Sequence, residues 1–481
     1  MSNQMFRDTV PSPPTGRDKL SWYGPGLLWM LSAVGTGSIL FTPRVAAVYE
    51  YQLFWLLLLV VYFMWVMIRE MARFSIVTGK TMLEGLYDLK GPRGWAVWLI
   101  FVPQLLAAAV GIAGLSAVVG SALQSFFPGN TAIYGIALVV LCTAFVASGQ
   151  YMLIEKASRF MAMLLMIGVL VAAVVVGPSL PAMGSGLVPS WPDEPDLYII
   201  LPWVGTILAG SMGLVWFGYW TATRGFGGGL TSADREEDEP EEAQREREQA
   251  QNDPQAREDA VERARAWVKL MSGAATLGVV GGLVVITAFL VLGAELLAPE
   301  GVVPEGTDVA VDLARLFSDV WGEAGRYLLL IAIVVALGGS VLANQDGWGR
   351  SFADMTLILT SHRRYAADRG WALGSLEWLK QRTGLPMLQR RYIKRLYVVT
   401  ITGLVPIAII LAFSDPVAVM SASGIIAALH TPFIALSALY VNRTRLPRDL
   451  QPGLAMTISM TLAGLFYLGF AGVYLWDLLS G

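Results

Sequence analysis

The chain has 481 residues, of which 55% are apolar and 15% are charged, and its net charge at pH 7 is -3. Soluble domains carry about 25% charged residues, so this composition excludes a soluble multidomain enzyme and predicts a protein with many membrane spans. The near-neutral charge gives no attraction for nucleic acid, and the single cysteine, Cys142, excludes an internal disulfide and a cysteine-based metal site.

Apolar stretches of about 20 residues, the length that crosses a bilayer, recur along the whole chain. Eleven spans are predicted, separated by charged segments or by segments that contain Gly and Pro. They cover residues 25–48, 52–76, 94–120, 131–148, 154–178, 199–222, 270–297, 325–345, 394–413, 417–440 and 452–478. We therefore expect an all-α polytopic membrane protein.

The distribution of Lys and Arg predicts the orientation of these spans, because cytoplasmic loops are enriched in both residues. With a cytoplasmic N-terminus, 31 of the 34 Lys and Arg residues lie in cytoplasmic segments or near the cytoplasmic ends of spans. Arg315 and Arg326 lie outside, and Arg44 lies within the first span. We therefore expect a multi-pass protein of the cell membrane, with its N-terminus inside and its C-terminus outside.

Three segments are expected on the cytoplasmic side: a polar tail over residues 1–24 and loops over residues 223–269 and 346–393. The first loop alternates acidic residues with Arg, which favours a solvated helix or a disordered loop over a regulatory or partner-binding segment. The second loop is basic and contains Trp371 and Trp378, a composition typical of an amphipathic helix on the inner leaflet.

Two spans contain small and polar residues near their middle. In the first span these are Ser32–Ser38, and in the sixth they are Ala209–Gly213. Transporters that alternate access about a midplane site use interrupted helices, because the freed backbone groups there can contact the substrate. The five-span separation predicts inverted repeats over residues 25–180 and 195–440, followed by an additional span over residues 450–481. Close helix packing by small residues is the alternative.

Short motifs along the chain resemble those of one family of membrane proteins. They are Gly24-Pro25-Gly26, Ile76–Lys80 with Glu84, Tyr151 with Glu155-Lys156, Leu187–Ser190, and Ser423 with Pro432 and Phe433. On these residues the chain is identified as a divergent member of the natural resistance-associated macrophage protein (NRAMP)-like superfamily of proton-coupled divalent-metal transporters. The resemblance implies a LeuT-like fold, with a 5+5 inverted repeat and broken spans 1 and 6, that works by alternating access.

The same alignment implies that the usual metal ligands of the family are replaced. The Asp-Pro-Gly-Asn motif of the family's first span corresponds to residues Gly35–Ser38, so an acidic and an amide ligand are missing. Its Met-Pro-His motif of the sixth span corresponds to Met212–Leu214, so the thioether is kept and the histidine is not. A thioether with backbone carbonyls supplies no negative charge to balance a divalent cation. We therefore expect no metal site, unless Met212 contributes to one.

Small hydroxyl-bearing residues with aromatic neighbours suit a neutral or zwitterionic organic solute better than a hard cation. The predicted substrate site consists of Gly35, Thr36, Gly37, Ser38, Gly210, Ser211, Met212, Gly213 and Trp216. Three hypotheses stay open: a symporter or other secondary transporter of a small solute that is not a transition metal, a proton-coupled divalent metal transporter, and a non-transporting sensor or scaffold. The expected partners are a small-molecule or ionic substrate, membrane lipid and a coupling H+ or Na+. No cofactor, nucleic-acid partner or enzymatic activity is expected.

Four ionisable residues are candidates for gating or coupling, each with a structural alternative. Arg44 is either an outer gate or a snorkelling or ion-paired side chain. Glu70, next to Arg69, is more typical of an interfacial salt bridge than of a coupling site. Asp346 is either an inner gate or ion site or a helix cap with surface pairing. His430 lies in the tenth span, where an imidazole can titrate near neutral pH, and a packing histidine is the alternative.

Overall fold

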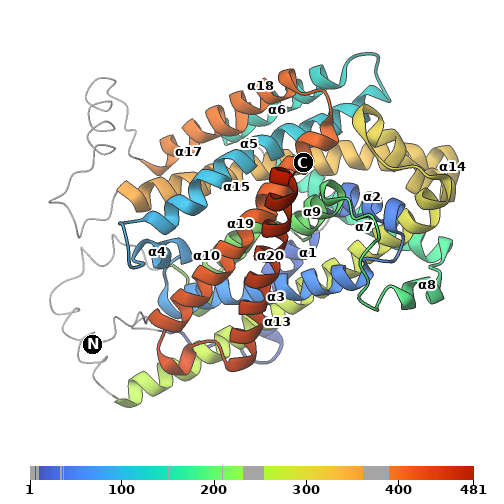
Figure 1. Cartoon of the computed structure of the whole chain (residues 1–481). Coiled ribbons are helices and arrows are strands. Elements are labelled where there is room, and N and C mark those ends of the chain that lie inside the picture. Colours follow the sequence, from blue (N-terminus) through green and yellow to red (C-terminus); the bar gives the residue numbers. More distant parts are fainter. Residues whose placement is uncertain are drawn as a thin grey trace, which may run out of the picture.

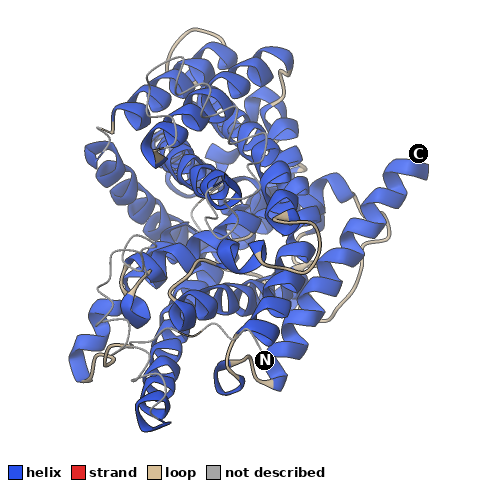
Figure 2. Cartoon of the chain, turned by 90° about the vertical axis from the view of Figure 1, so that its left-hand side faces the viewer, coloured by secondary structure: helices blue, strands red, loops and turns tan. Residues whose placement is uncertain are grey.

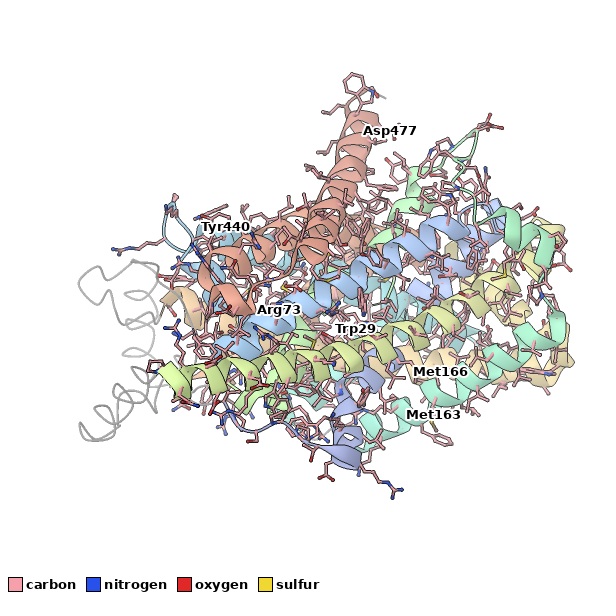
Figure 3. All side chains as sticks on the ribbon, turned by 90° about the horizontal axis from the view of Figure 1, so that it is seen from below. Trp29, Arg73, Met163, Met166, Tyr440 and Asp477 are labelled. Carbon is pink, nitrogen blue, oxygen red and sulfur yellow. The ribbon has the colours of Figure 1, made fainter. Side chains whose placement is uncertain are left out.

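The computed structural model describes residues 6, 10–32, 35, 37–149, 152–208, 210–230, 254–360 and 389–480. This part of the chain folds into a bundle of helices that contains no strand (Figure 1, Figure 2). The all-α prediction is therefore confirmed. Trp29 lies inside the bundle, and Asp477 lies on the end of the last helix that projects from it (Figure 3).

The helices follow one another in the predicted order. The first half contains α1 (Gly24–Ser32), η2 (Gly37–Phe41), α2 (Thr42–Tyr49), α3 (Phe54–Thr78), α4 (Met82–Tyr87), α5 (Trp95–Gln124), α6 (Thr131–Ser148), α7 (Met152–Val176) and α8 (Leu180–Ser185). The second half contains α9 (Leu197–Thr206), α10 (Gly210–Thr223), α13 (Pro254–Leu292), α14 (Val309–Ala332), α15 (Gly338–Thr360), α17 (Arg390–Val399), α18 (Val405–Ala412), α19 (Pro416–Arg445) and α20 (Leu454–Ser480).

Ten helical stretches of the described residues are long and apolar enough to cross a membrane, and they correspond in order to the second to eleventh predicted spans. The first predicted span is divided among α1, η2 and α2, each too short to cross a bilayer alone. The number of eleven spans stays a prediction. Short α4, expected on the inside, lies at one end of the bundle in Figure 1, and α8, expected on the outside, lies at the opposite end.

Two helices continue past their predicted spans. α13 begins at Pro254, within the predicted loop 223–269, and α15 ends at Thr360, within the predicted loop 346–393. Ala, Arg, Glu and Gln residues of high helix propensity favour the continuation of α13, and the continuation of α15 forms ion pairs with α17. The remainder of both loops, including Trp371 and Trp378, lies largely outside the described residues.

The centre of the bundle depends on glycine contacts between helices. A Cβ added at Gly114 of α5 would lie 2.7 Å from the Cα of Met420 on α19. A Cβ added at Gly205 of α9 would overlap the carbonyl oxygen of Gly424, also on α19. Glycine lets these backbones approach closely enough for α5 and α9 to pack against α19. This arrangement brings three helices that are distant in sequence to one place.

Candidate functional site

The first predicted span is interrupted between α1 and η2, as expected. In this connection the backbone N–H groups of Ser38 and Ile39 donate hydrogen bonds to the carbonyl oxygen of Gly35, over 3.1 and 2.9 Å. These bonds begin a short π-helical turn, so the Gly35 carbonyl is already engaged by its own chain. Thr36, another predicted site residue, lies outside the described residues.

The sixth predicted span is interrupted slightly earlier than the sequence indicated. α9 ends at Thr206, Ile207 is extended, and Leu208 and Gly210 have φ angles of +67° and +64°. The left-handed conformation favours glycine and is strained at a leucine. The predicted residues Gly210–Gly213 therefore form the first turn of α10 rather than the irregular segment itself. The first N–H groups of this turn have no partner within the helix.

The two interrupted helices touch each other beside the breaks. A Cβ added at Gly37 would overlap the carbonyl oxygen of Thr206, so only glycine fits there. Thr42 donates to the carbonyl oxygen of Gly37 over 2.8 Å and accepts from the indole N–H of Trp203 over 3.0 Å. Ser38, beside this contact, is 1% exposed. η2, α2 and α9 thus form one hydrogen-bonded unit.

Aromatic side chains connect the other halves of the same helices. Trp29 of α1 makes edge contacts with Phe217 and Trp220 of α10, with ring centroids 5.4 and 6.2 Å apart. Trp216, predicted to border the substrate, donates its indole N–H to Ser351 of α15 over 2.9 Å. The structure therefore associates Trp216 with α15 and does not bring it to the breaks by any described contact.

A buried polar cluster lies at the start of α10. The amide nitrogen of Gln104 on α5 is 2.8 Å from the hydroxyl of Ser211 and 2.8 Å from Nδ1 of His430 on α19. The three side chains are 1%, 2% and 6% exposed, respectively. The sequence analysis included Ser211 and His430 but missed Gln104. The sequence could have indicated Gln104, because it is the one side-chain amide in an apolar stretch and directly follows Pro103.

The donors at this site are electrically neutral as arranged. They are the amide of Gln104, the hydroxyls of Ser38 and Ser211, the imidazole of His430 and the backbone at the breaks. Met212, the candidate thioether ligand, is 3% exposed in the first turn of α10. Across the described residues, no group of three or more His, Cys, Asp or Glu side chains is placed to hold a metal ion.

Arg44 joins α2 to two segments at the predicted outer end. Its guanidinium pairs with Glu305 over 2.8 Å and reaches the carbonyl oxygen of Tyr198 over 3.5 Å. Pro202 lies four residues after Tyr198 in α9 and has no N–H, so this carbonyl lacks its usual helical partner. The Arg44 side chain is 10% exposed and that of Glu305 is 58% exposed. Arg44 is therefore ion-paired, as one of its two predicted alternatives stated. An ion pair at this place is also compatible with an outer gate.

Glu70 forms a salt bridge, but not with its sequence neighbour. Arg73 donates two hydrogen bonds to the Glu70 carboxylate, over 2.8 and 3.1 Å, one helical turn away. The amide of Asn442 on α19 donates to the Glu70 carbonyl and carboxylate over 2.8 and 3.2 Å. Arg69 points elsewhere, with its guanidinium 4.3 Å from the ring centroid of Trp65. Glu70 is completely buried.

Asp346 lies within α15 and does not cap a helix end. Its carboxylate pairs with Arg350 over 2.7 Å and with Lys394 of α17. A second pair, between Asp354 and Arg390 over 2.5 Å, connects the same two helices. The expected surface pairing is therefore present, and it attaches α17 to α15.

Comparisons with known proteins agree with this arrangement. The profile of the family described as natural resistance-associated macrophage protein-like matches residues 26–345, which is more than half of the chain. A curated relative, a protein of Pasteurella multocida (strain Pm70) described as uncharacterised, is 24% identical over 163 residues. That match covers 34% of this chain and only 37% of the relative's length.

Several solved structures have a similar fold. A crystal structure of a point variant of the Eremococcus coleocola manganese transporter matches with a TM-score of 0.59 and 13% identity, covering 95% of this chain and 89% of that one. The same transporter in complex with an aromatic bis-isothiourea substituted compound matches with a TM-score of 0.56 and 16% identity, covering 97% and 90%. At this identity the similarity shows the fold.

Proposed function

This chain belongs to the natural resistance-associated macrophage protein-like family of membrane transporters, and on that premise we propose that it moves a small solute that is not a transition metal. The site consists of the two breaks and the Gln104, Ser211 and His430 cluster. The buried cluster carries the proposal, because Ser211 places a specific polar side chain in the first turn of α10, directly after the sixth-span break.

The chemistry of these donors supports a neutral or zwitterionic solute. Hydroxyl, amide and helix-terminal N–H groups satisfy the polar atoms of an organic molecule, whereas a divalent cation requires negative ligands to offset its desolvation. The second candidate is a proton-coupled divalent metal transporter. It is favoured by the retained Met212 and by the similar solved structures, which are of a manganese transporter.

Alternating access is the proposed mechanism, with a cytoplasmic N-terminus and H+ or Na+ as the coupling ion. The close packing of α9 against α19, together with the burial of Ser38 and Ser211, supports a conformer closed on the predicted outer side. Arg44 and Glu305 hold the same side closed in this proposal. Opening requires η2 and α9 to move away from α19.

Metal flux tests the proposal directly. Wild-type protein in proteoliposomes, with a metal-sensitive dye inside, is expected to take up Mn²⁺ and Mg²⁺ no faster than empty liposomes. A manganese transporter of the family serves as the positive control, and the double variant Gly35→Asp, Ser38→Asn tests whether restored ligands restore metal flux. Saturable uptake by the wild type would establish the second candidate instead.

Ligand-dependent stability provides the positive arm of the same test. Neutral and zwitterionic solutes are screened for an increase in melting temperature, since a ligand at a hundred times its Kd stabilises the folded state by about 2.7 kcal/mol. A solute that stabilises the wild type but not Ser211→Ala is expected. Stabilisation by Mn²⁺ alone would contradict the proposal.

The outer ion pair leads to a smaller prediction. In a Cys142→Ser background, a cysteine at Ser38 reports opening through its labelling by a membrane-impermeant maleimide. Glu305→Gln is expected to raise the labelling rate up to about fivefold, because Glu305 is largely exposed and an exposed ion pair contributes at most about 1 kcal/mol. The difference from the wild type should shrink in high salt. A salt-independent effect would contradict an electrostatic latch.

A further inference from the structure

The environment of His430 determines which ring nitrogen carries its proton. Gln104 contacts Nδ1 through its amide nitrogen, which can donate hydrogen bonds but cannot accept them. Nδ1 must therefore be the unprotonated, accepting nitrogen, and the proton of the neutral ring lies on Nε2. Nε2 is buried and makes no hydrogen bond of its own.

α5 also brings a backbone acceptor to the His430 ring that its own helix leaves unused. The backbone carbonyl of Leu99 on α5 acts on the His430 ring. In a regular helix this carbonyl would accept from the N–H of the residue four positions later, but that residue is Pro103. Because the Gln104 amide occupies Nδ1, Nε2–H is the ring donor that remains for such a carbonyl.

The amide of Gln104 connects this choice to α10. The same nitrogen that donates to Nδ1 also donates to the hydroxyl of Ser211, so both of its protons are used. If His430 takes up a second proton at Nδ1, the amide nitrogen can no longer face it. The amide must then turn to present Oε1 to Nδ1–H, and the Ser211 hydroxyl must change from acceptor to donor.

We propose that His430 and Gln104 form a proton-sensitive switch, and that this switch changes the hydrogen bond of Ser211 at the start of α10. This inference rests on the proposed function and supplies a coupling site for it. Ser211 belongs to the broken helix, whereas Gln104 and His430 belong to α5 and α19, which are packed together. Proton uptake on α19 thereby changes the hydrogen bond that holds the first turn of α10. No proton leaves the network in this step, since one is added at Nδ1 and the hydroxyl only reorients.

The surrounding helices bring no charge to His430. Neither a carboxylate nor a cation of the described residues acts on the ring, and α5 contains no ionisable residue. On α3 the charged groups are Arg69, Glu70 and Arg73: Arg73 donates to Glu70, which also accepts from Asn442, twelve residues further along α19, and Arg69 donates to Ser272. On α9 the ionisable side chain is Tyr198, and on α20 the ionisable side chains are Tyr467, Tyr474 and Asp477. On α4, Glu84 bonds Thr81, and on α10 the ionisable side chain is Tyr219.

Nitrogen NMR can test the tautomer without any knowledge of the solute. The chain has only two histidines, so protein labelled with [15N]histidine and carrying His362→Asn gives signals from His430 alone. The neutral ring is expected to show a protonated Nε2 and an unprotonated Nδ1. Gln104→Glu should move the proton to Nδ1, because a carboxylate only accepts. A protonated Nδ1 in the otherwise unchanged protein would overturn the proposal, since the amide would then face the opposite way.

Hydrogen exchange at residues 210–213 tests whether protonation of His430 changes the stability of the first turn of α10. After correction for the intrinsic exchange rate, lowering the pH through the titration of His430 is expected to increase exchange in this turn by about fivefold, the factor that one neutral hydrogen bond contributes. His430→Phe should abolish this pH dependence. Ser423→Ala is the matched control, because Ser423 also connects α19 to α5, through the Ala107 carbonyl, and should keep it.

The two experiments separate this inference from the proposed function. If the tautomer and the exchange behave as expected but no organic solute is found, the switch stands and the substrate assignment falls. If solute transport is found while exchange in the first turn of α10 is independent of pH, or stays pH-dependent in His430→Phe, the switch is wrong and the transporter proposal is unaffected.

Discussion

Arg73→Ala is expected to destabilise the folded protein by about 3–5 kcal/mol, the cost of leaving one partner of a buried ion pair uncompensated. Glu70 is completely buried, and both of its carboxylate oxygens accept from Arg73 over 2.8 and 3.1 Å. Without Arg73, the carboxylate keeps only the Asn442 amide in an otherwise apolar region. Thermal or denaturant unfolding in detergent measures the loss of stability.

Arg69→Ala is the matched control for this prediction. Arg69 is adjacent to Glu70 in sequence and lies on the same helix, but its side chain contacts Ser272, Met456 and the Trp65 ring. Its loss is expected to cost about 1 kcal/mol, the contribution of an ordinary hydrogen bond. Equal destabilisation by the two substitutions would contradict the assignment of Arg73 as the partner of Glu70.

Gly205→Ala is expected to open the predicted outer side of the protein. The added Cβ would overlap the Gly424 carbonyl oxygen, a backbone atom that cannot rotate away, so α9 must move from α19. Overpacking of this kind costs about 1–3 kcal/mol, which shifts a two-state equilibrium by about 5- to 150-fold. Labelling of a cysteine at Ser38, in the Cys142→Ser background, should increase by a factor in this range.

Gly469→Ala on α20 is the control, because no atom lies within 4 Å of a Cβ built there. Gly424→Ala provides a second test of the same contact, since its Cβ would lie 2.8 Å from the Cα of Pro202. If Gly205→Ala and Gly424→Ala leave labelling at the level of Gly469→Ala, the contact of α9 with α19 does not close this side. If a cysteine at Ser38 is protected from the maleimide applied to either side of the membrane, the conformer is occluded.

Several residues beside the two breaks could be predicted because their signals are local. Gly37, Ser38 and Ser211 interrupt apolar runs, and a small polar residue in a membrane span is visible without knowledge of its neighbours. The position of the sixth-span break was less accurate. The irregular segment depends on the positive φ angle of Leu208, and a leucine in the sequence gives no sign of such a conformation. Gly210, which did give a sign, lies where the segment ends and α10 begins.

The partner of a charged side chain could not be predicted from its nearest neighbour in the sequence. Arg69 and Arg73 are both near Glu70 in sequence, but only residues three or four positions apart share a helix face. The position of Arg73 therefore allows the pair, and the packing of α19 beside α3 adds Asn442. Trp216 was placed at the substrate site from sequence proximity, and its contact with Ser351 on α15 became apparent only from the fold.

The sequence by itself determined the membrane class, the order of the spans, the two interruptions and the family, because hydropathy and short motifs are read along the chain. Only the tertiary structure decided that Gln104 meets Ser211 and His430, which are 107 and 326 positions away. Contacts across such separations depend on how closely helices pack, and that is set by glycines at Gly114, Gly205 and Gly424 acting together. The buried amide of Gln104, the hydroxyl of Ser211 and the imidazole of His430 then bond to one another, because each needs a hydrogen-bond partner away from water.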